Sequence, residues 1–229
     1  MKNPYLEHLK ELYEVCYNKE DSEAMSAYMK NKFEFYGIKS EKRKEIVKQF
    51  LKENGLPPAG DLDKIILELW DLPEREYQYF GMELVKKHLK DLNPKSMRLI
   101  EFMILNKSWW DTIDYIASNI VGGIFISYPE LIDCYTDKWV DSDNVWLKRT
   151  ALLFQLKYRT ETNEKLLFEN ILKLSDSDEF FIQKAIGWSL REYSKHEPAR
   201  VIKFVKKNKL KPLSEREALK IVKKIKVAP

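Results

Sequence analysis

The sequence predicts an all-α protein, and three of its features lead to this prediction. The 229-residue chain has only seven glycines and no run of alternating apolar and polar residues that would indicate a strand. Apolar residues recur at helical spacing, and capping residues divide them into about twelve helices joined by short loops. The chain also contains an internal repeat. We expect residues 1–229 to form a single domain.

Capping residues mark where the expected helices begin and end. Ser40 precedes a helical segment that Gly55 follows, which is the pattern of an N-cap and a C-terminal stop. Asn93 and Pro94 place a cap and a first-turn proline before the helix that follows them. Later helices are expected to begin at Ser108, at Ser142, at Asp176 or Ser177, and at Leu213-Ser214.

The repeat has a length of 35 residues. The segment SDNVWLKRTALLFQLKY at 142–158 aligns without gaps on SDEFFIQKAIGWSLREY at 177–193. Paired helices at this period indicate an α-solenoid of HEAT-like repeats, in which equivalent residues form a row along one concave face. That row would be polar and mostly cationic, although its residues could also simply face solvent. Its predicted members are Tyr79, Asp114, Arg149 and Lys184.

The composition excludes several classes of protein. With 44% apolar and 33% charged residues, the chain is neither disordered nor a membrane span. No apolar run approaches the length that a bilayer requires. The first residues, MKNPYLEHLKELYEVC, are charged throughout and do not resemble a signal peptide. We therefore expect a cytoplasmic protein, associated with the nucleoid if the source is a prokaryote.

Cysteine and histidine give no sign of a metal site. Cys16 and Cys134 are expected to stay reduced as small buried side chains, with a disulfide or a metal pair as the lesser alternative. The histidines are far apart and have no ligand spacing around them, so we expect no metal and no cofactor. They are His8, His88 and His196.

The charge of the chain is unevenly distributed. From Arg200 onward there are eleven Lys or Arg and two acidic residues, a local balance of +9. Residues 1–199 carry 29 basic and 34 acidic residues, a balance of −5. This asymmetry indicates a polyanionic partner near the C-terminal end. Judged by charge alone, a solvated basic helix explains this segment better than a polyanionic partner does.

The motif SWWDTID contains two adjacent tryptophans that cannot both face the core of a helix, because successive residues are rotated by about 100°. Trp109 is predicted to be core, since it continues an apolar stripe. Trp110 shares a face with Asp114, and fits a second packing layer and a functional role equally well. Asp111 is expected to be a surface acid. The apolar stripe consists of Trp109, Ile113, Ile116 and Ile120.

A third tryptophan lies between two cations. Lys184, Trp188 and Arg191 follow one another at i, i+4 and i+7 and therefore share a helix face. Such a face suits the backbone and sugars of a nucleic acid. The plainer interpretation is an exposed face stabilised by cation–π contacts. Arg149 and Lys157 on the preceding helix extend the same basic path.

The chain resembles the AlkD-type alkylpurine DNA glycosylases of the DNA alkylation repair family, which are built of HEAT-like repeats. The resemblance covers nearly the whole chain, and the motifs WWD-x-x-D and FIQKAIGW are specific to it. It implies excision of N3- and N7-alkylated purines, such as 3-methyladenine and 7-methylguanine, from duplex DNA without flipping the base. The segments that carry it are YMKNKFEFYGI, ELWDLPEREYQ, LNKSWWDTID, DNVWLKRTALLFQLKY, EFFIQKAIGWSLREY and PLSEREALK.

The resemblance also implies roles for individual residues. It places the catalytic aspartate and two tryptophans of the site at Asp114, Trp110 and Trp188. It places DNA contacts at Arg149, Arg191 and Tyr28, to which the basic path adds Lys184 and Lys157.

These residue types suit the chemistry of a cationic leaving group. An alkylated purine carries a positive charge, so no general acid has to protonate it. A carboxylate such as Asp114 can stabilise the oxocarbenium ion and position water, while indole rings line the sugar. The alternatives are a non-catalytic HEAT-repeat scaffold that binds DNA or protein, and a relative that has lost excision. Capped solenoids need no partner copy, so we expect a monomer.

Overall fold

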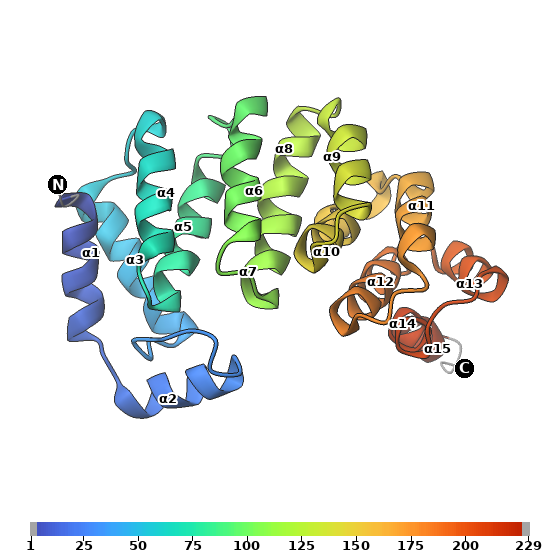
Figure 1. Cartoon of the computed structure of the whole chain (residues 1–229), viewed down its shortest axis with the longest axis horizontal. Coiled ribbons are helices and arrows are strands. Elements are labelled where there is room, and N and C mark those ends of the chain that lie inside the picture. Colours follow the sequence, from blue (N-terminus) through green and yellow to red (C-terminus); the bar gives the residue numbers. More distant parts are fainter. Residues whose placement is uncertain (1–3, 226–229) are drawn as a thin grey trace. The chain divides into compact units, whose positions relative to one another are not determined.

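The structure is a computed structural model that describes residues 4–225, and its regular elements are helices (Figure 1). In these residues there is no strand, and one isolated bridge joins Glu34 to Glu74. This confirms the prediction of an all-α protein. The chain divides after Asp91 into two compact units. That the whole chain forms one domain stays a prediction.

The first unit packs its helices in pairs, with α4 against α5 and α1 against α3. Gly55 ends α3 as expected, with φ of 72°. The N-cap position is Lys39 rather than Ser40, which is the first helical residue, and the Lys39 side chain makes no capping hydrogen bond. The helices of this unit are α1 (Pro4–Val15), α2 (Lys19–Tyr28), α3 (Ser40–Asn54), α4 (Leu62–Asp71) and α5 (Arg75–Lys87), with a 3₁₀ turn at Ala59–Asp61.

A buried carboxylate holds the segment that follows α2. Glu76 is fully buried on α5 and accepts hydrogen bonds from the backbone N–H groups of Tyr36 (3.2 Å), Gly37 (3.1 Å) and Ile38 (3.1 Å). Burial raises the pKa of the Glu76 carboxyl, and the N–H groups of Ile38 and Tyr36 oppose that shift. Gly37 has φ of 81°, and a Cβ there would lie 2.3 Å from the carbonyl oxygen of Asn18.

The second unit contains the remaining helices, and each of the longer ones packs against a neighbour. Helix α10 lies against α9 and α12, and α12 also packs closely on α14. These helices are α6 (Met97–Leu105), α7 (Trp110–Tyr115), α8 (Gly122–Ser127), α9 (Leu131–Val140), α10 (Val145–Leu153), α11 (Glu164–Leu174), α12 (Phe180–Tyr193), α13 (Pro198–Lys207), α14 (Pro212–Ala218) and α15 (Lys220–Ile225). Shorter pieces are a π-helix at Ile116–Val121 and 3₁₀ turns at Pro94–Ser96, Phe154–Lys157 and Arg159–Glu161.

The period of the repeat is visible in the hydrogen bonds of the second unit. Side chains there bond across separations of 36 or 37 residues, close to the offset of 35 found in the sequence. Each such bond joins an element to its equivalent one repeat later, as stacking of repeats requires. They are Tyr158 to the Gly122 carbonyl (2.8 Å), Lys173 to Asp137 (2.8 Å), Arg200 to Glu164 (3.1 Å), Tyr128 to the Leu92 carbonyl (3.3 Å) and Lys138 to Glu101 (2.7 Å).

The two thiols are unpaired, but neither is buried as predicted. Cys16 is half-buried and Cys134 is exposed. Cys134 lies on α9, where Trp139 fills the core five residues later, so the cysteine points to the other side of the helix. In residues 4–225 no group of His, Cys, Asp and Glu is arranged to hold a metal ion. None of the described helices is long and apolar enough to span a bilayer.

Gly37→Ala should destabilise the protein more than Gly55→Ala. Both glycines have positive φ, but only at Gly37 would a Cβ collide with backbone. A Cβ at Gly55 would meet no atom within 4 Å beyond its own neighbours in the chain. Backbone strain alone costs about 1–3 kcal/mol, and the collision adds to it at Gly37. Thermal unfolding of the two variants measures the difference. Equal melting temperatures would show that the close approach to Asn18 is not required.

Candidate functional site

An ion pair between α7 and α10 lies at the centre of the candidate site. Arg149 donates from Nε to Oδ1 of Asp114 (2.7 Å) and from Nη2 to Oδ2 (2.9 Å). Its Nη1 donates to the carbonyl oxygen of Phe181 on α12 (2.6 Å). The Arg149 side chain is 5% exposed and that of Asp114 is 16% exposed. The guanidinium is therefore held on three sides, and only the carboxylate reaches solvent to any extent.

The surroundings of Asp114 act on its charge in opposite directions. Burial raises the pKa of the Asp114 carboxyl, the Arg149 guanidinium lowers it, and the negative charge of Asp111 raises it. Two charge-assisted hydrogen bonds in a fork geometry favour the ionised form. Asp114 thus presents a carboxylate of fixed orientation whose charge is only partly screened by water.

The helix that carries Asp114 begins later than predicted. Trp109 is the N-cap, with extended backbone (φ −158°, ψ 162°), and α7 starts at Trp110. Ile113 and the later isoleucines of the apolar stripe are fully buried, as predicted. Trp109 does not continue that stripe, because an N-cap residue does not have helical phase. It is half-buried and packs against the rings of Trp146 (5.6 Å) and Phe181 (5.1 Å).

A π-helix begins shortly after Asp114, and two of its side chains hydrogen-bond to the backbone of α7. Ser118 donates to the carbonyl oxygen of Asp114 (2.8 Å), and the Asn119 amide donates to that of Tyr115 (3.0 Å). The exposed Lys157 in turn donates to Asn119 Oδ1. π-Helical turns occur frequently at functional sites. Here the wider turn begins two residues after the carboxylate.

The two tryptophans expected at the site are each half-buried in the second unit. Trp110 precedes Asp114 by four residues on α7, so both lie on one face of that helix. Trp188 lies on α12, whose buried side is formed by other residues, including Ile182 and Ile186. Both rings thus lie between the core and the surface.

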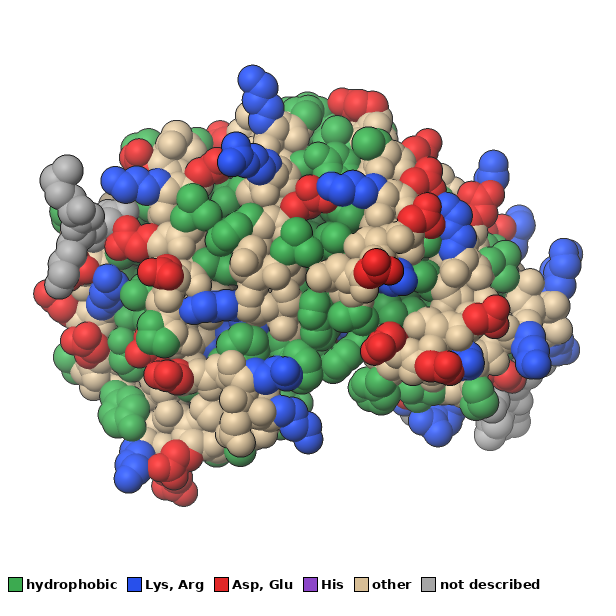
Figure 2. Space-filling model, viewed as in Figure 1, with side chains coloured by type: hydrophobic (Ala, Val, Ile, Leu, Met, Phe, Trp, Pro, Cys, Tyr) green, Lys and Arg blue, Asp and Glu red, His purple; other side chains and the backbone are tan. Residues whose placement is uncertain are grey.

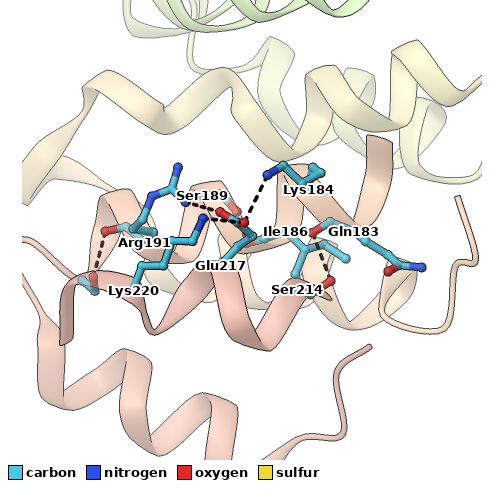
Figure 3. Close-up of polar contacts among 9 residues, drawn as sticks. Gln183, Lys184, Ile186, Ser189, Arg191, Ser214, Glu217 and Lys220 are labelled. Carbon is cyan, nitrogen blue, oxygen red and sulfur yellow. Dashed lines mark hydrogen bonds and ion pairs between the residues drawn. The ribbon is translucent and has the colours of Figure 1, made fainter. Parts of the chain in front are cut away.

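Lys184 and Arg191 share a partner that the sequence analysis did not single out. Glu217 on α14 accepts hydrogen bonds from Lys184, Arg191 and Lys220 (Figure 3). Burial acts to raise the pKa of the Glu217 carboxyl, but the three cations outweigh it and lower the pKa to about 2. Glu217 could have been noticed as one of only two acids after Arg200.

An aromatic cluster beside the ion pair was also missed. Trp146 and Phe181 lie 4.9 Å apart, and Phe180, which is exposed, lies 5.5 Å from Phe181. The Arg149 guanidinium lies 5.9 Å from the Phe181 ring. The repeat held the signal, because Trp146 and Phe181 occupy equivalent positions at an offset of 35.

Two predicted residues lie in the first unit. Tyr28 is the last residue of α2 and is exposed. Tyr79, the first member of the predicted row, lies on α5, where the Arg43 guanidinium is 4.4 Å from its ring. Whether either residue shares a surface with Asp114 stays a prediction.

The basic C-terminal segment is partly described by the structure. Figure 2 shows Lys and Arg side chains gathered at the end of the second unit where α13 lies. Its exposed cations are Arg200, Lys203, Lys206 and Lys207. Side chains from residue 223 onward, including three of the counted lysines, lie outside the described residues.

Trp109→Ala should destabilise the protein more than Trp110→Ala, because Trp109 packs edge-on against two aromatic rings. Loss of a packed tryptophan costs about 3 kcal/mol. Thermal or urea unfolding of both variants gives the comparison. If Trp110→Ala were the less stable of the two, the assignment of packing to Trp109 would be wrong.

Comparison with known proteins shows the family of the chain. The family model for DNA alkylation repair enzymes matches residues 8–222. A solved structure of a predicted DNA alkylation repair enzyme from Enterococcus faecalis matches with a TM-score of 0.83 and 35% identity, over 89% of this chain and 95% of that one. No curated protein matches. The structural match supports the predicted all-α solenoid fold class. The chain therefore belongs to the DNA alkylation repair enzyme family, as its sequence resemblance predicted.

Proposed function

We propose that the protein is a DNA glycosylase that hydrolyses the N-glycosidic bond of cationic N3- and N7-alkylated purines in duplex DNA. Membership of the family indicates a role in DNA repair and DNA as the partner. The finer assignment rests on one observation, the carboxylate of Asp114 held by Arg149 near the surface of the second unit. The expected substrates are 3-methyladenine and 7-methylguanine.

The reaction needs little from the protein besides this carboxylate. When the bond between C1′ and the purine nitrogen breaks, its electron pair leaves with the base and neutralises the base's positive charge. Positive charge then develops on the deoxyribose. Asp114 stabilises that charge and orients the water that adds to C1′, and its carboxylate accepts the proton that the water loses. A neutral base needs a proton in order to leave, and no residue of the proposed site supplies one. Neutral lesions should therefore be poor substrates.

Arg149 acts, in this proposal, as a positioning residue for Asp114. Its guanidinium donates to both carboxylate oxygens and to the Phe181 carbonyl, and its side chain is almost fully buried. These contacts support an indirect role more than a phosphate contact. Direct binding of DNA by Arg149, which the resemblance implied, stays a prediction.

The remaining site residues hold the DNA. Trp110 and Trp188 would line the sugar and offer electron-rich faces to the developing cation. The damaged nucleotide would stay stacked, so contacts go to the backbone instead of to a flipped base. The residues proposed for these contacts are Arg191, Lys184, Lys157 and Tyr28. We further propose a monomer without a metal or cofactor that works in the cytoplasm on nucleoid DNA.

A non-catalytic DNA- or protein-binding scaffold is the rival function, and the ion pair between Asp114 and Arg149 is also compatible with it. A buried pair with matched geometry can serve packing alone. A surface that only binds phosphates, however, gains nothing from a carboxylate that is 16% exposed. The exposure of Asp114 therefore favours catalysis, and removal of its charge separates the two functions.

Asp114→Asn should lower single-turnover excision of 7-methylguanine by about 10²–10³-fold, because loss of one preorganised electrostatic contact typically costs this much. Affinity for duplex DNA should change little. Asp111→Asn is the matched control, with the same charge change on the same helix. Release of free base measures excision, and thermal melting shows whether each variant is folded. Wild-type rates in a folded Asp114→Asn variant would support the scaffold.

Excision should decrease as the solution becomes acidic. The reaction needs ionised Asp114, and burial raises the pKa of this carboxyl above its ordinary value of 3.8. Activity is therefore present above the folded-state pKa and is lost as pH falls through it, at a higher pH than an exposed aspartate would give. Single-turnover rates across pH, corrected for spontaneous depurination, measure this. A rate that increased on acidification would argue instead for a general acid.

A further inference from the structure

The junction of α12 and α14 contains a carboxylate surrounded by three cations (Figure 3). Glu217 Oε1 accepts from Lys184 Nζ (3.1 Å) and Lys220 Nζ (2.6 Å), and Oε2 accepts from Arg191 Nη1 (2.6 Å). Only 6% of the Glu217 side chain is exposed. Lys184 and Arg191 lie on α12, Glu217 lies on α14, and Lys220 is the first residue of α15. Glu217 lies in PLSEREALK, a segment to which no role has been given above.

A close approach of the two helices puts Glu217 in this position. A Cβ on Gly187 would lie 2.3 Å from the Cβ of Glu217 and 2.9 Å from the carbonyl oxygen of Ser214. The Ser214 hydroxyl also donates to the Gln183 carbonyl (3.0 Å). Only a glycine at 187 allows this distance. The Glu217 carboxylate therefore lies against α12, between Lys184 three residues before Gly187 and Arg191 four residues after it.

The cluster leaves positive charge facing outward. Three cations surround one carboxylate, so the group has a formal charge of +2. The side chains of Lys184, Arg191 and Lys220 are 37%, 24% and 51% exposed, while the anion is inside. An ammonium has three N–H donors and a guanidinium five, so one bond each to Glu217 does not exhaust them. A second anion can therefore be bound from the solvent side.

We propose that Lys184, Arg191 and Lys220 form a binding site for one backbone phosphate of duplex DNA, in which Glu217 is the positioning residue. The proposal rests on the proposed function for duplex DNA as the ligand and for backbone contacts by Lys184 and Arg191. It adds Lys220 as a third cation and Glu217 as the residue that positions all three. Long cationic side chains lose conformational freedom when they bind a phosphate. Because the buried Glu217 carboxylate already holds the three cationic side chains in one place, less conformational freedom is lost when phosphate binds. Lys184 and Trp188 share a face of α12, so the phosphate would lie on the same side of that helix as the Trp188 ring.

A purely structural role for Glu217 makes the opposite prediction about DNA affinity. If Glu217 only fastens α14 to α12, Glu217→Gln removes a negative charge and should strengthen the attraction of DNA. If Glu217 positions the cations, the same variant should weaken binding despite its extra positive charge. Glu217→Asp, which keeps the charge but shortens the reach, should recover part of the affinity.

The test measures binding of undamaged duplex DNA by fluorescence anisotropy at several salt concentrations. Lys220→Gln should weaken binding about threefold to tenfold and lower the salt slope by about 0.9, the value for one phosphate contact. Lys173→Gln, which removes an equal charge from a lysine paired with Asp137 on α9, is the control and should change neither. Glu217→Gln should weaken binding, and Lys220→Gln should cost less in that background than in the wild type.

The outcomes separate the two roles and do not depend on excision. Equal binding by Lys220→Gln and Lys173→Gln, or tighter binding by a folded Glu217→Gln, would overturn the proposal. If Glu217→Gln does not fold, the comparison of the two lysine variants decides alone. Because the DNA is undamaged, the phosphate site could stand even if Asp114→Asn left excision unchanged, and the proposed function could stand without the phosphate site.

Discussion

The bidentate ion pair between Asp114 and Arg149 is the interaction on which the candidate site depends. Removing a carboxylate and a guanidinium from water costs several kcal/mol for each ion, so such a pair persists only with matched geometry and further hydrogen bonds. Here the geometry is a fork, and the remaining side of the guanidinium donates to the Phe181 carbonyl. Three helices from successive parts of the chain thus fix one carboxylate, which is what electrostatic stabilisation of a transition state requires.

Sequence alone could bring this pair together because its separation equals the repeat. Asp114 and Arg149 are 35 residues apart, the offset at which the two best-matched segments align. The same offset relates Trp146 to Phe181, whose rings are in contact. A repeat predicts which side chains are neighbours, but it gives no information on how deeply each side chain is buried. Arg149 was therefore interpreted as part of a cationic row along the concave face, although its side chain is almost fully buried.

What the sequence did not reveal depends on local backbone geometry or on contacts outside the repeat. Trp109 was assigned to a helical stripe, but its extended backbone at the N-cap turns its side chain toward Trp146. Periodicity assumes a helix from the first residue and so fails at its ends. Glu217 was missed for another reason. Its importance comes from the close approach at Gly187, which no spacing of charges along the chain encodes.

Asp114 and Glu217 are both carboxylates bound to cations, yet their pKa values are shifted in opposite directions. Burial raises the pKa of Asp114 against a single arginine, whereas three cations lower that of Glu217 to about 2. A carboxylate with one cationic partner carries no excess positive charge around it, so a developing cation nearby is still attracted. The cluster of Glu217 and its three cations has a net positive charge, so it repels a developing cation and attracts phosphate. In the two proposals these groups have separate tasks. Asp114 stabilises charge that develops during bond cleavage, and Glu217 positions the cations that bind the fixed charge of the DNA backbone.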